Sequence, residues 1–105
     1  MNRKQQLDKL LTAFTEEKRF ISDGYYRIRT INPSTLELAY LLSGPCGDSI
    51  VHPQITLSIN GEEVVGIKLI DMYSSPQLFM HRNDENSNQI DNALDKLIEK
   101  FLTKM

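Results

Sequence analysis

The architecture of this chain can be worked out from residues 25–42, YYRIRTINPSTLELAYLL. Both halves of this stretch are rich in β-branched, aromatic and aliphatic residues, which favour a pleated, half-buried strand. Between the halves, Asn32-Pro33-Ser34 is a turn sequence. The stretch therefore predicts an antiparallel hairpin with strands at 25–31 and 35–42 and a three-residue loop at 32–34.

The pairing register of this hairpin follows from its side chains. If Ile28 lies opposite Leu38, then Arg29 lies opposite Glu37, and the two form an opposite-charge cross-strand pair. A shift by one residue would set Arg29 beside Leu38 and would mix apolar and charged side chains on both faces. The first register predicts a core face made of Tyr26, Ile28, Leu36, Leu38, Tyr40 and Leu42.

The chain beyond residue 43 continues as strands. After a Gly-rich loop at 43–49, residues 50–59 alternate as a strand does, and Asn60-Gly61 is a strong hairpin signal. The returning strand, 62–70, has two possible registers: a two-residue turn pairs Val64 with Leu57, whereas a longer loop pairs Val65 with Leu57. We favour the second register, because it gathers Val65, Ile67 and Leu69 on the apolar side, and we expect Gly66 to mark a bulge. Residues 77–82 form a last strand, with Leu78 and Met80 pointing inward.

Both ends of the chain show helical periodicity. Leu7, Leu10, Leu11 and Phe14 form an apolar stripe that predicts a helix over about residues 3–18. The final segment carries a wider stripe, and Asn86 or Ser87 can cap its N-terminus. Its members are Ile90, Ala93, Leu94, Leu97, Ile98, Phe101, Leu102 and Met105.

These elements predict one α+β domain over residues 1–105, an antiparallel meander of about five strands between N- and C-terminal helices. We expect both helices to pack on one sheet face, because each has an apolar stripe to bury. The chain has 105 residues, 40% of them hydrophobic and 25% charged, with a net charge of −2. This balance disfavours disorder, and the slightly acidic charge disfavours general attraction to nucleic acid.

The cellular setting is inferred from cysteine usage and hydropathy. Cys46 is the one cysteine, so no intramolecular disulfide can form, which favours the reducing cytoplasm. The first residues lack the apolar segment of a signal peptide, and no apolar run approaches the about 20 residues of a membrane span. We therefore expect a cytoplasmic protein with no membrane contact.

The residues with chemical potential are few. Cys46 lies in the Gly-rich loop a few positions before His52, but a nucleophile and its base need hydrogen-bond contact, which sequence proximity does not supply. The loop resembles a phosphate cradle only superficially, because a strand follows it and not a helix. His52, His81 and Cys46 lack the spacings of metal sites. The sequence thus predicts no enzyme, no cofactor and no metal.

The face of the sheet opposite the helices is the candidate working surface. It is expected to mix aromatic, arginine and aliphatic side chains, as interfaces do. The predicted interface comprises Tyr25, Arg27, Arg29, Ile31, Glu37 and Leu41, with Ala39, Val64 and Ile70 on the same face. A protein partner or a homodimer would occupy it.

Two other hypotheses use different residues. In one, Tyr25, Arg27, Arg29 and Lys68 form a basic and aromatic strand face that binds nucleic acid or a nucleotide, although the acidic charge of the chain disfavours this. In the other, Cys46 is the nucleophile of an enzyme, with His52 or His81 as its base.

Overall fold

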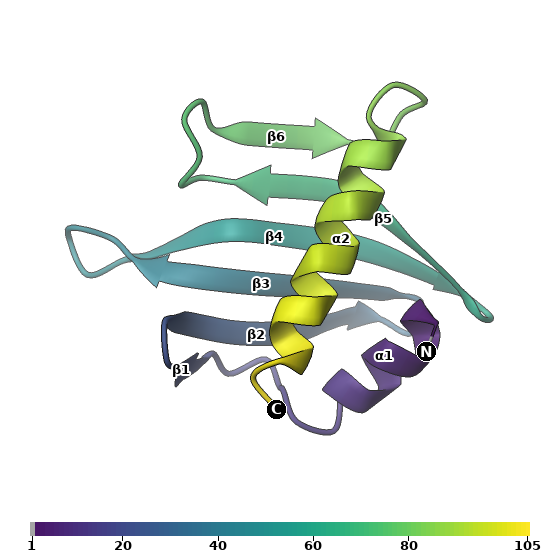
Figure 1. The fold of residues 1–105 in the computed structure, drawn as a ribbon, viewed down its shortest axis with the longest axis horizontal. Coiled ribbons are helices and arrows are strands. Elements are labelled where there is room, and N and C mark those ends of the chain that lie inside the picture. The colour runs from purple at the N-terminus through teal and green to yellow at the C-terminus, as the bar shows by residue number, and fades with distance from the viewer. Residues whose placement is uncertain (1) are drawn as a thin grey trace.

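The computed structural model describes residues 2–105, which form one six-stranded antiparallel sheet with two helices. The strands lie in the sheet in the order in which they occur along the chain (Figure 1). The elements are α1 (Arg3–Leu10), β1 (Arg19–Ile21), β2 (Gly24–Asn32), β3 (Thr35–Ser43), β4 (Ser49–Asn60), β5 (Glu63–Asp71), β6 (Leu78–His81) and α2 (Ser87–Leu102). The α+β meander between two helices is therefore as predicted, but the sheet has six strands and not five.

The additional strand is β1, which follows directly on the helix predicted over residues 3–18; the second half of that helix, residues 11–18, is turn and loop instead. The helix ends at Leu10, and Leu11, which the predicted stripe would bury, is 42% exposed. Phe14 still reaches the core, where its ring makes an edge contact with Phe101 at 5.0 Å between centroids. Because the chain turns after Leu10, Thr15 runs beside β2 and its carbonyl accepts a hydrogen bond from the amide of Ile28.

Both helices pack on one sheet face, as predicted (Figure 1). α2 crosses the strands diagonally and contacts β5, and α1 packs against both α2 and β5. Gly66 of β5 permits this approach, because a Cβ there would lie 2.7 Å from Cγ2 of Ile90. The side chains that α2 buries are Ile90, Leu94, Leu97, Ile98 and Phe101. Met105, which the predicted stripe included, lies beyond the helix and is 50% exposed.

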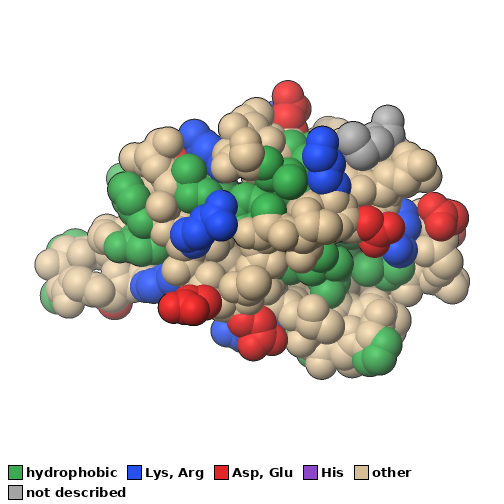
Figure 2. All heavy atoms as spheres, turned by 90° about the horizontal axis from the view of Figure 1, so that it is seen from below, with side chains coloured by type: hydrophobic (Ala, Val, Ile, Leu, Met, Phe, Trp, Pro, Cys, Tyr) green, Lys and Arg blue, Asp and Glu red, His purple; other side chains and the backbone are tan. Residues whose placement is uncertain are grey.

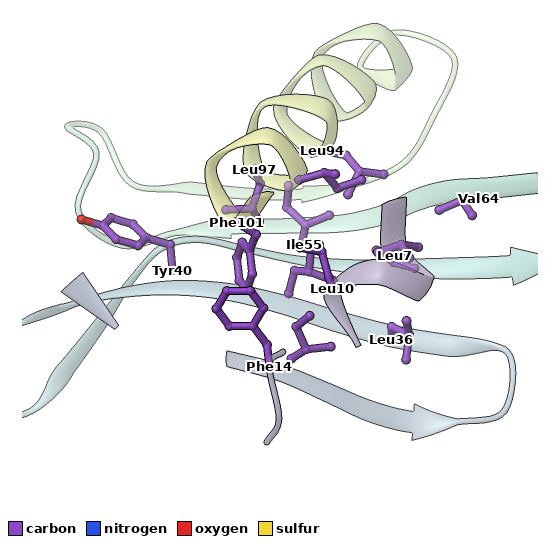
Figure 3. Close-up of a cluster of buried hydrophobic side chains, with 14 of the residues drawn as sticks. Leu7, Leu10, Phe14, Leu36, Tyr40, Ile55, Val64, Leu94, Leu97 and Phe101 are labelled. Atoms are coloured by element: carbon purple, nitrogen blue, oxygen red, sulfur yellow. The ribbon is translucent and has the colours of Figure 1, made fainter. Parts of the chain in front are cut away.

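The core lies between the helices and the sheet (Figure 3). Phe101 stands over the middle of the sheet and meets Tyr26 edge-on at 5.1 Å between ring centroids. The predicted core face of the first hairpin is buried, apart from Leu42, which is partly exposed. Asn86 occupies the N-cap position of α2, but its side chain does not cap the helix. Its side-chain amide instead donates to the carbonyl of His81.

The first hairpin has the predicted register: Ile28 pairs with Leu38 and Arg29 with Glu37. The register then shifts at Ile31, so that Asn32 pairs with Thr35 and only Pro33 and Ser34 remain in the loop.

The register predicted for β4 and β5 is wrong. Leu57 pairs with Gly66, whereas Val65 lies opposite Ser58 on the other face. A bulge follows Gly66, as expected from the glycine, and it brings Leu69 opposite Ile55. The core therefore takes Val64 and Leu69 from β5, and Ile67 is 38% exposed.

Candidate functional site

The sheet face opposite the helices carries no other element of residues 2–105; we call it the open face. Residues paired across antiparallel strands share a face, so the registers give the rows of side chains that cross it. The first row, here called the apolar row, contains Phe20, Tyr25, Leu41 and Val51, and Met72, whose amide donates to the carbonyl of Val51. The second row contains Arg27, Ala39, Gln54, Ile70 and Phe79, and the third contains Arg29, Glu37, Thr56, Lys68 and His81.

The apolar row is most exposed at its ends. Phe20 is 60% exposed and Met72 is 38% exposed. The ring of Phe20 meets that of Tyr25 edge-on at 5.3 Å, and Nζ of Lys18 lies 4.8 Å from the centre of the Tyr25 ring. Leu41, on the central strand β3, is only 3% exposed. The middle of the row is therefore packed and largely inaccessible, and a partner would contact mainly the side chains at its two ends.

Charged groups occupy the neighbouring rows. Oε1 of Glu37 lies 3.7 Å from Nη2 of Arg27 and 3.6 Å from Nη1 of Arg29. Arg27 donates to Oε1 of Gln54 at 3.2 Å. Because Ala39 lies between these two residues in the second row, the side chain of Arg27 covers Ala39, which is fully buried. Among residues 2–105, Nε of Arg27 and Oε1 of Glu37 have no hydrogen-bond partner, although both are buried. Glu37 therefore balances the charge of the arginines without satisfying all of their hydrogen bonds.

The structure places the predicted interface residues at different depths. Arg29 and Ile31 are exposed, and Tyr25 and Arg27 are partly buried. Glu37 and Leu41 lie on the open face but are buried among their neighbours, so a partner could touch little of either. Ile31 sits in the bulge of the hairpin, apart from the apolar row.

Val64 and Ile70, which were also expected on the open face, lie on opposite sides of the sheet. Val64 belongs to the helix-side core and not to the open face, because the register of β5 differs from the predicted one. Ile70 is on the open face as expected, opposite Phe79. The sequence did not point to Phe20 or Phe79, because the segment before Phe20 has a helical period and Phe79 lies in a short edge strand. Both are strongly exposed, at 60% and 64%.

The opposite side of the sheet holds a paired histidine that the sequence did not reveal. Nδ1 of His52 lies 2.8 and 2.9 Å from the two carboxylate oxygens of Asp71. Asp71 also accepts hydrogen bonds from the amides of Tyr73 and Ser74. Burial raises the pKa of this carboxyl group, but the bonds from His52 and the two amides outweigh it and hold the pKa below its usual value. The ring of Tyr73 packs 4.9 Å from that of His52.

A small cavity of about 200 Å³ opens beside His52, between β4 and α2. Its lining residues are Pro53, Ala93, Lys96, Leu97 and Lys100. Lys100 is already engaged, because its ammonium bonds Asp23 at 3.2 Å and lies 4.2 Å from the centre of the Tyr40 ring. The lining is mostly apolar, so the cavity suits a small apolar group.

The remaining candidate groups lie apart in the elements described. Cys46 is exposed in the loop between β3 and β4. Within residues 2–105, its thiol makes no hydrogen bond to His52 or His81. His81 is on β6, opposite Lys68. Within residues 2–105 no group of three His, Cys, Asp or Glu side chains is placed to hold a metal ion, and no helix is long and apolar enough to cross a membrane.

Comparisons with protein-family models, with curated proteins and with solved structures give no match for this chain.

Proposed function

We propose that this chain is a non-catalytic binding protein whose open face docks onto a partner protein with an apolar contact surface bordered by carboxylates. The observation that carries the proposal is the apolar row, which crosses four strands, ends at Met72 just after β5, and has no helix of residues 2–105 over it. The exposed apolar side chains of this row lie at its two ends, and exposed apolar surface on a small protein tends to mark an interaction site. Aromatic side chains such as Phe20 and Tyr25 are frequent energetic anchors of interfaces.

The charges beside the apolar row indicate the chemistry of the partner. The two neighbouring rows contain three cationic side chains, Arg27, Arg29 and Lys68, and one carboxylate, Glu37. Arg29, whose side chain is 49% exposed, and the half-buried Lys68 remain accessible. A surface with carboxylates on that side would be attracted, whereas a basic surface would be repelled.

The alternative, in which the same strand face binds nucleic acid, receives less support from the geometry. Glu37 lies within 3.7 Å of both Arg27 and Arg29, so it offsets part of the positive charge that would attract phosphates. Seen from below the view of Figure 1, where β1 forms the edge of the sheet, hydrophobic side chains are interspersed with both signs of charge (Figure 2). Strong phosphate binding would need a surface of predominantly one sign.

The test compares variants on the two faces that are matched in exposure. Phe20→Glu lies on the open face and Tyr73→Glu on the helix side, and the wild-type residues are 60% and 59% exposed. Proteins captured by the immobilised wild-type chain from its native host are quantified by mass spectrometry and compared with those captured by each variant. A protein lost with Phe20→Glu but retained with Tyr73→Glu is then purified and titrated.

The expected result is that Phe20→Glu and Met72→Glu each weaken binding of the purified partner at least about tenfold, as loss of an anchor does. Tyr73→Glu should bind as the wild type does. Binding of a single-stranded oligonucleotide that weakens steeply with salt would favour the nucleic-acid alternative. If capture is equally affected on both faces, or on neither, the open face is not the working surface.

A further inference from the structure

The free edge of the sheet at β6 is unlike the free edge at β1. Strand β6, Leu78–His81, contains no charged residue and no proline, and Phe79 on it is 64% exposed. Strand β1, Arg19–Ile21, has only three residues, begins with an arginine and follows Lys18. Short length and positive charge are features that keep sheet edges from pairing with other chains, and β6 lacks the charge.

The backbone groups that face outward from β6 can be identified from its pairing with β5. The amide of Arg82 donates to the carbonyl of Ile67, so Arg82 is in a hydrogen-bonded pair with β5. Hydrogen bonding alternates along an antiparallel pair, so Met80 and Leu78 also bond β5, whereas Phe79 and His81 point their backbone groups away from it. The carbonyl of His81 is occupied by the side-chain amide of Asn86 at 2.8 Å. Both backbone groups of Phe79 and the amide of His81 thus remain available at the free edge.

We propose that β6 pairs antiparallel with β6 of a second copy of this chain, about a two-fold axis at Phe79. Antiparallel pairing of identical strands is self-complementary, because each residue meets the same partner from both sides. In this register the two Phe79 residues exchange both of their backbone hydrogen bonds, and the amide of His81 donates to the carbonyl of Gln77 of the other copy. No like charges meet within the strand, and the residue at the axis is apolar.

The exposed ring of Phe79 also favours a second copy as the occupant. Phe79 points to the open face, opposite Ile70 of β5. Across the axis the two Cα atoms would lie about 5.5 Å apart, so the two rings would meet as a cross-strand aromatic pair. At the β1 edge, a two-fold axis at Lys18 or Arg19 would set like charges directly opposite each other, which opposes pairing, and an axis at Phe20 would pair a strand of only three residues. This inference does not depend on the proposed function, because it concerns the pure chain and a different set of contacts.

The test measures the mass of the pure protein by sedimentation, over concentrations up to about 1 mM to include weak pairing. The wild-type mass should rise with concentration from 12.1 kDa toward twice that value. Phe79→Lys sets two ammonium groups at the axis, and His81→Pro removes an amide that points away from β5. Both variants should keep the monomer mass, with association weakened at least about tenfold. Phe20→Lys is the matched control on the β1 edge, at 60% exposure against 64%, and should associate as the wild type does.

Amide hydrogen exchange gives a second readout at the edge itself. The amides of Phe79 and His81 should exchange more slowly as concentration rises, while that of Met80, already bonded to β5, should not change. This readout needs no variant and so does not depend on how well a variant folds. A wild type that stays monomeric over the whole range overturns the proposal. So does association that survives both Phe79→Lys and His81→Pro, or association that only Phe20→Lys abolishes.

Discussion

Replacing Gly66 by alanine should push α2 away from β5. The new Cβ would lie 2.7 Å from Cγ2 of Ile90, 3.6 Å from Cγ2 of Ile55 and 3.7 Å from Cδ2 of Leu94. Ile90, Ile55 and Leu94 are all fully buried, so none of them can swing into solvent to make room. Overpacking a core costs about 1–3 kcal/mol. The loss of backbone freedom in the unfolded chain returns about 0.4–1 kcal/mol. We therefore expect Gly66→Ala to destabilise the fold by about 1–2 kcal/mol, or about 5–15 °C in melting temperature for a chain of this length.

A second substitution tests whether the clash with Ile90 is the cause. Ile90→Leu keeps the volume of the side chain but removes the γ2 methyl group, so the double variant Gly66→Ala/Ile90→Leu should recover most of the loss. Urea denaturation of all four proteins gives the coupling energy, which should be favourable by about 1 kcal/mol. Gly61→Ala is the control: Gly61 has φ +62°, and a Cβ added there would meet nothing within 4 Å, so its cost of about 1–2 kcal/mol comes from backbone strain. Ile90→Leu should not relieve it.

The result that refutes this reasoning is a coupling energy near zero between positions 66 and 90. α2 would then not lie against β5 at Gly66, and the placement of both helices on one sheet face would lose its closest contact. The opposite sheet face could then no longer be described as uncovered by the helices.

The remaining predictions concern charged and reactive groups. Asp71→Asn should cost about 1–3 kcal/mol at neutral pH, because it weakens hydrogen bonds to a buried carboxylate. The pKa of Asp71 is lower in the folded state than in the unfolded state. Its carboxylate therefore stabilises the fold fully above the unfolded pKa of about 3.9, and this stabilisation is lost as pH falls through the folded pKa. In acid unfolding experiments, the stabilities of the wild type and the variant should converge. Glu37→Gln should cost up to about 3 kcal/mol in urea denaturation, because it leaves the partly buried guanidinium of Arg27 without a counter-charge. Arg27→Met/Glu37→Leu should cost less than Glu37→Gln alone. Cys46→Ser should leave melting temperature and partner capture unchanged, since the thiol is exposed in a loop; a loss of capture would contradict this.

The first hairpin could be predicted in detail because two independent signals agreed. Apolar alternation set the core face, and the Arg29–Glu37 pair fixed the register, which the structure has. The second hairpin offered no such charge pair. Its bulge after Gly66 shifts one half of β5 against the other, so no single register fits, and neither alternative from the sequence was right. Gly66 indicated the bulge, but the register on each side of it could not be read from the alternation of side chains.

The N-terminal helix was predicted too long for a similar reason. The spacing of Leu10, Leu11 and Phe14 suits a continuous helix, but in a helix through residue 18 the carbonyl of Thr15 would not accept from the amide of Ile28 on β2. Phe14 reaches the core from a turn instead. An apolar period fixes which residues are buried more reliably than it fixes the conformation that buries them.

The sheet face of the candidate site could be predicted, but the burial of the individual side chains on it could not. Two terminal helices with one apolar stripe each were enough to predict an open face. That Leu41 and Glu37 would be buried there depends on how Tyr25, Arg27 and Gln54 cover the central strand. The His52–Asp71 pair was invisible because its partners are 19 positions apart on neighbouring strands. Only the register of β4 and β5 brings them together, and that register could not be derived.

The two proposed surfaces meet at β6, and this yields a last prediction. Phe79 closes the second row of the open face, next to Ile70. A two-fold axis perpendicular to the sheet would set both open faces on the same side, so that the row continues from one copy into the other. A surface densely coated with the partner could then engage both copies, and the second contact would form at the high effective concentration of a linked site. Phe79→Lys should therefore dissociate faster from a dense partner surface than the wild type, yet bind a sparse one with the same affinity. Equal dissociation on both surfaces would show that the β6 edge and the open face act separately, and faster dissociation on both would place Phe79 in the partner contact itself.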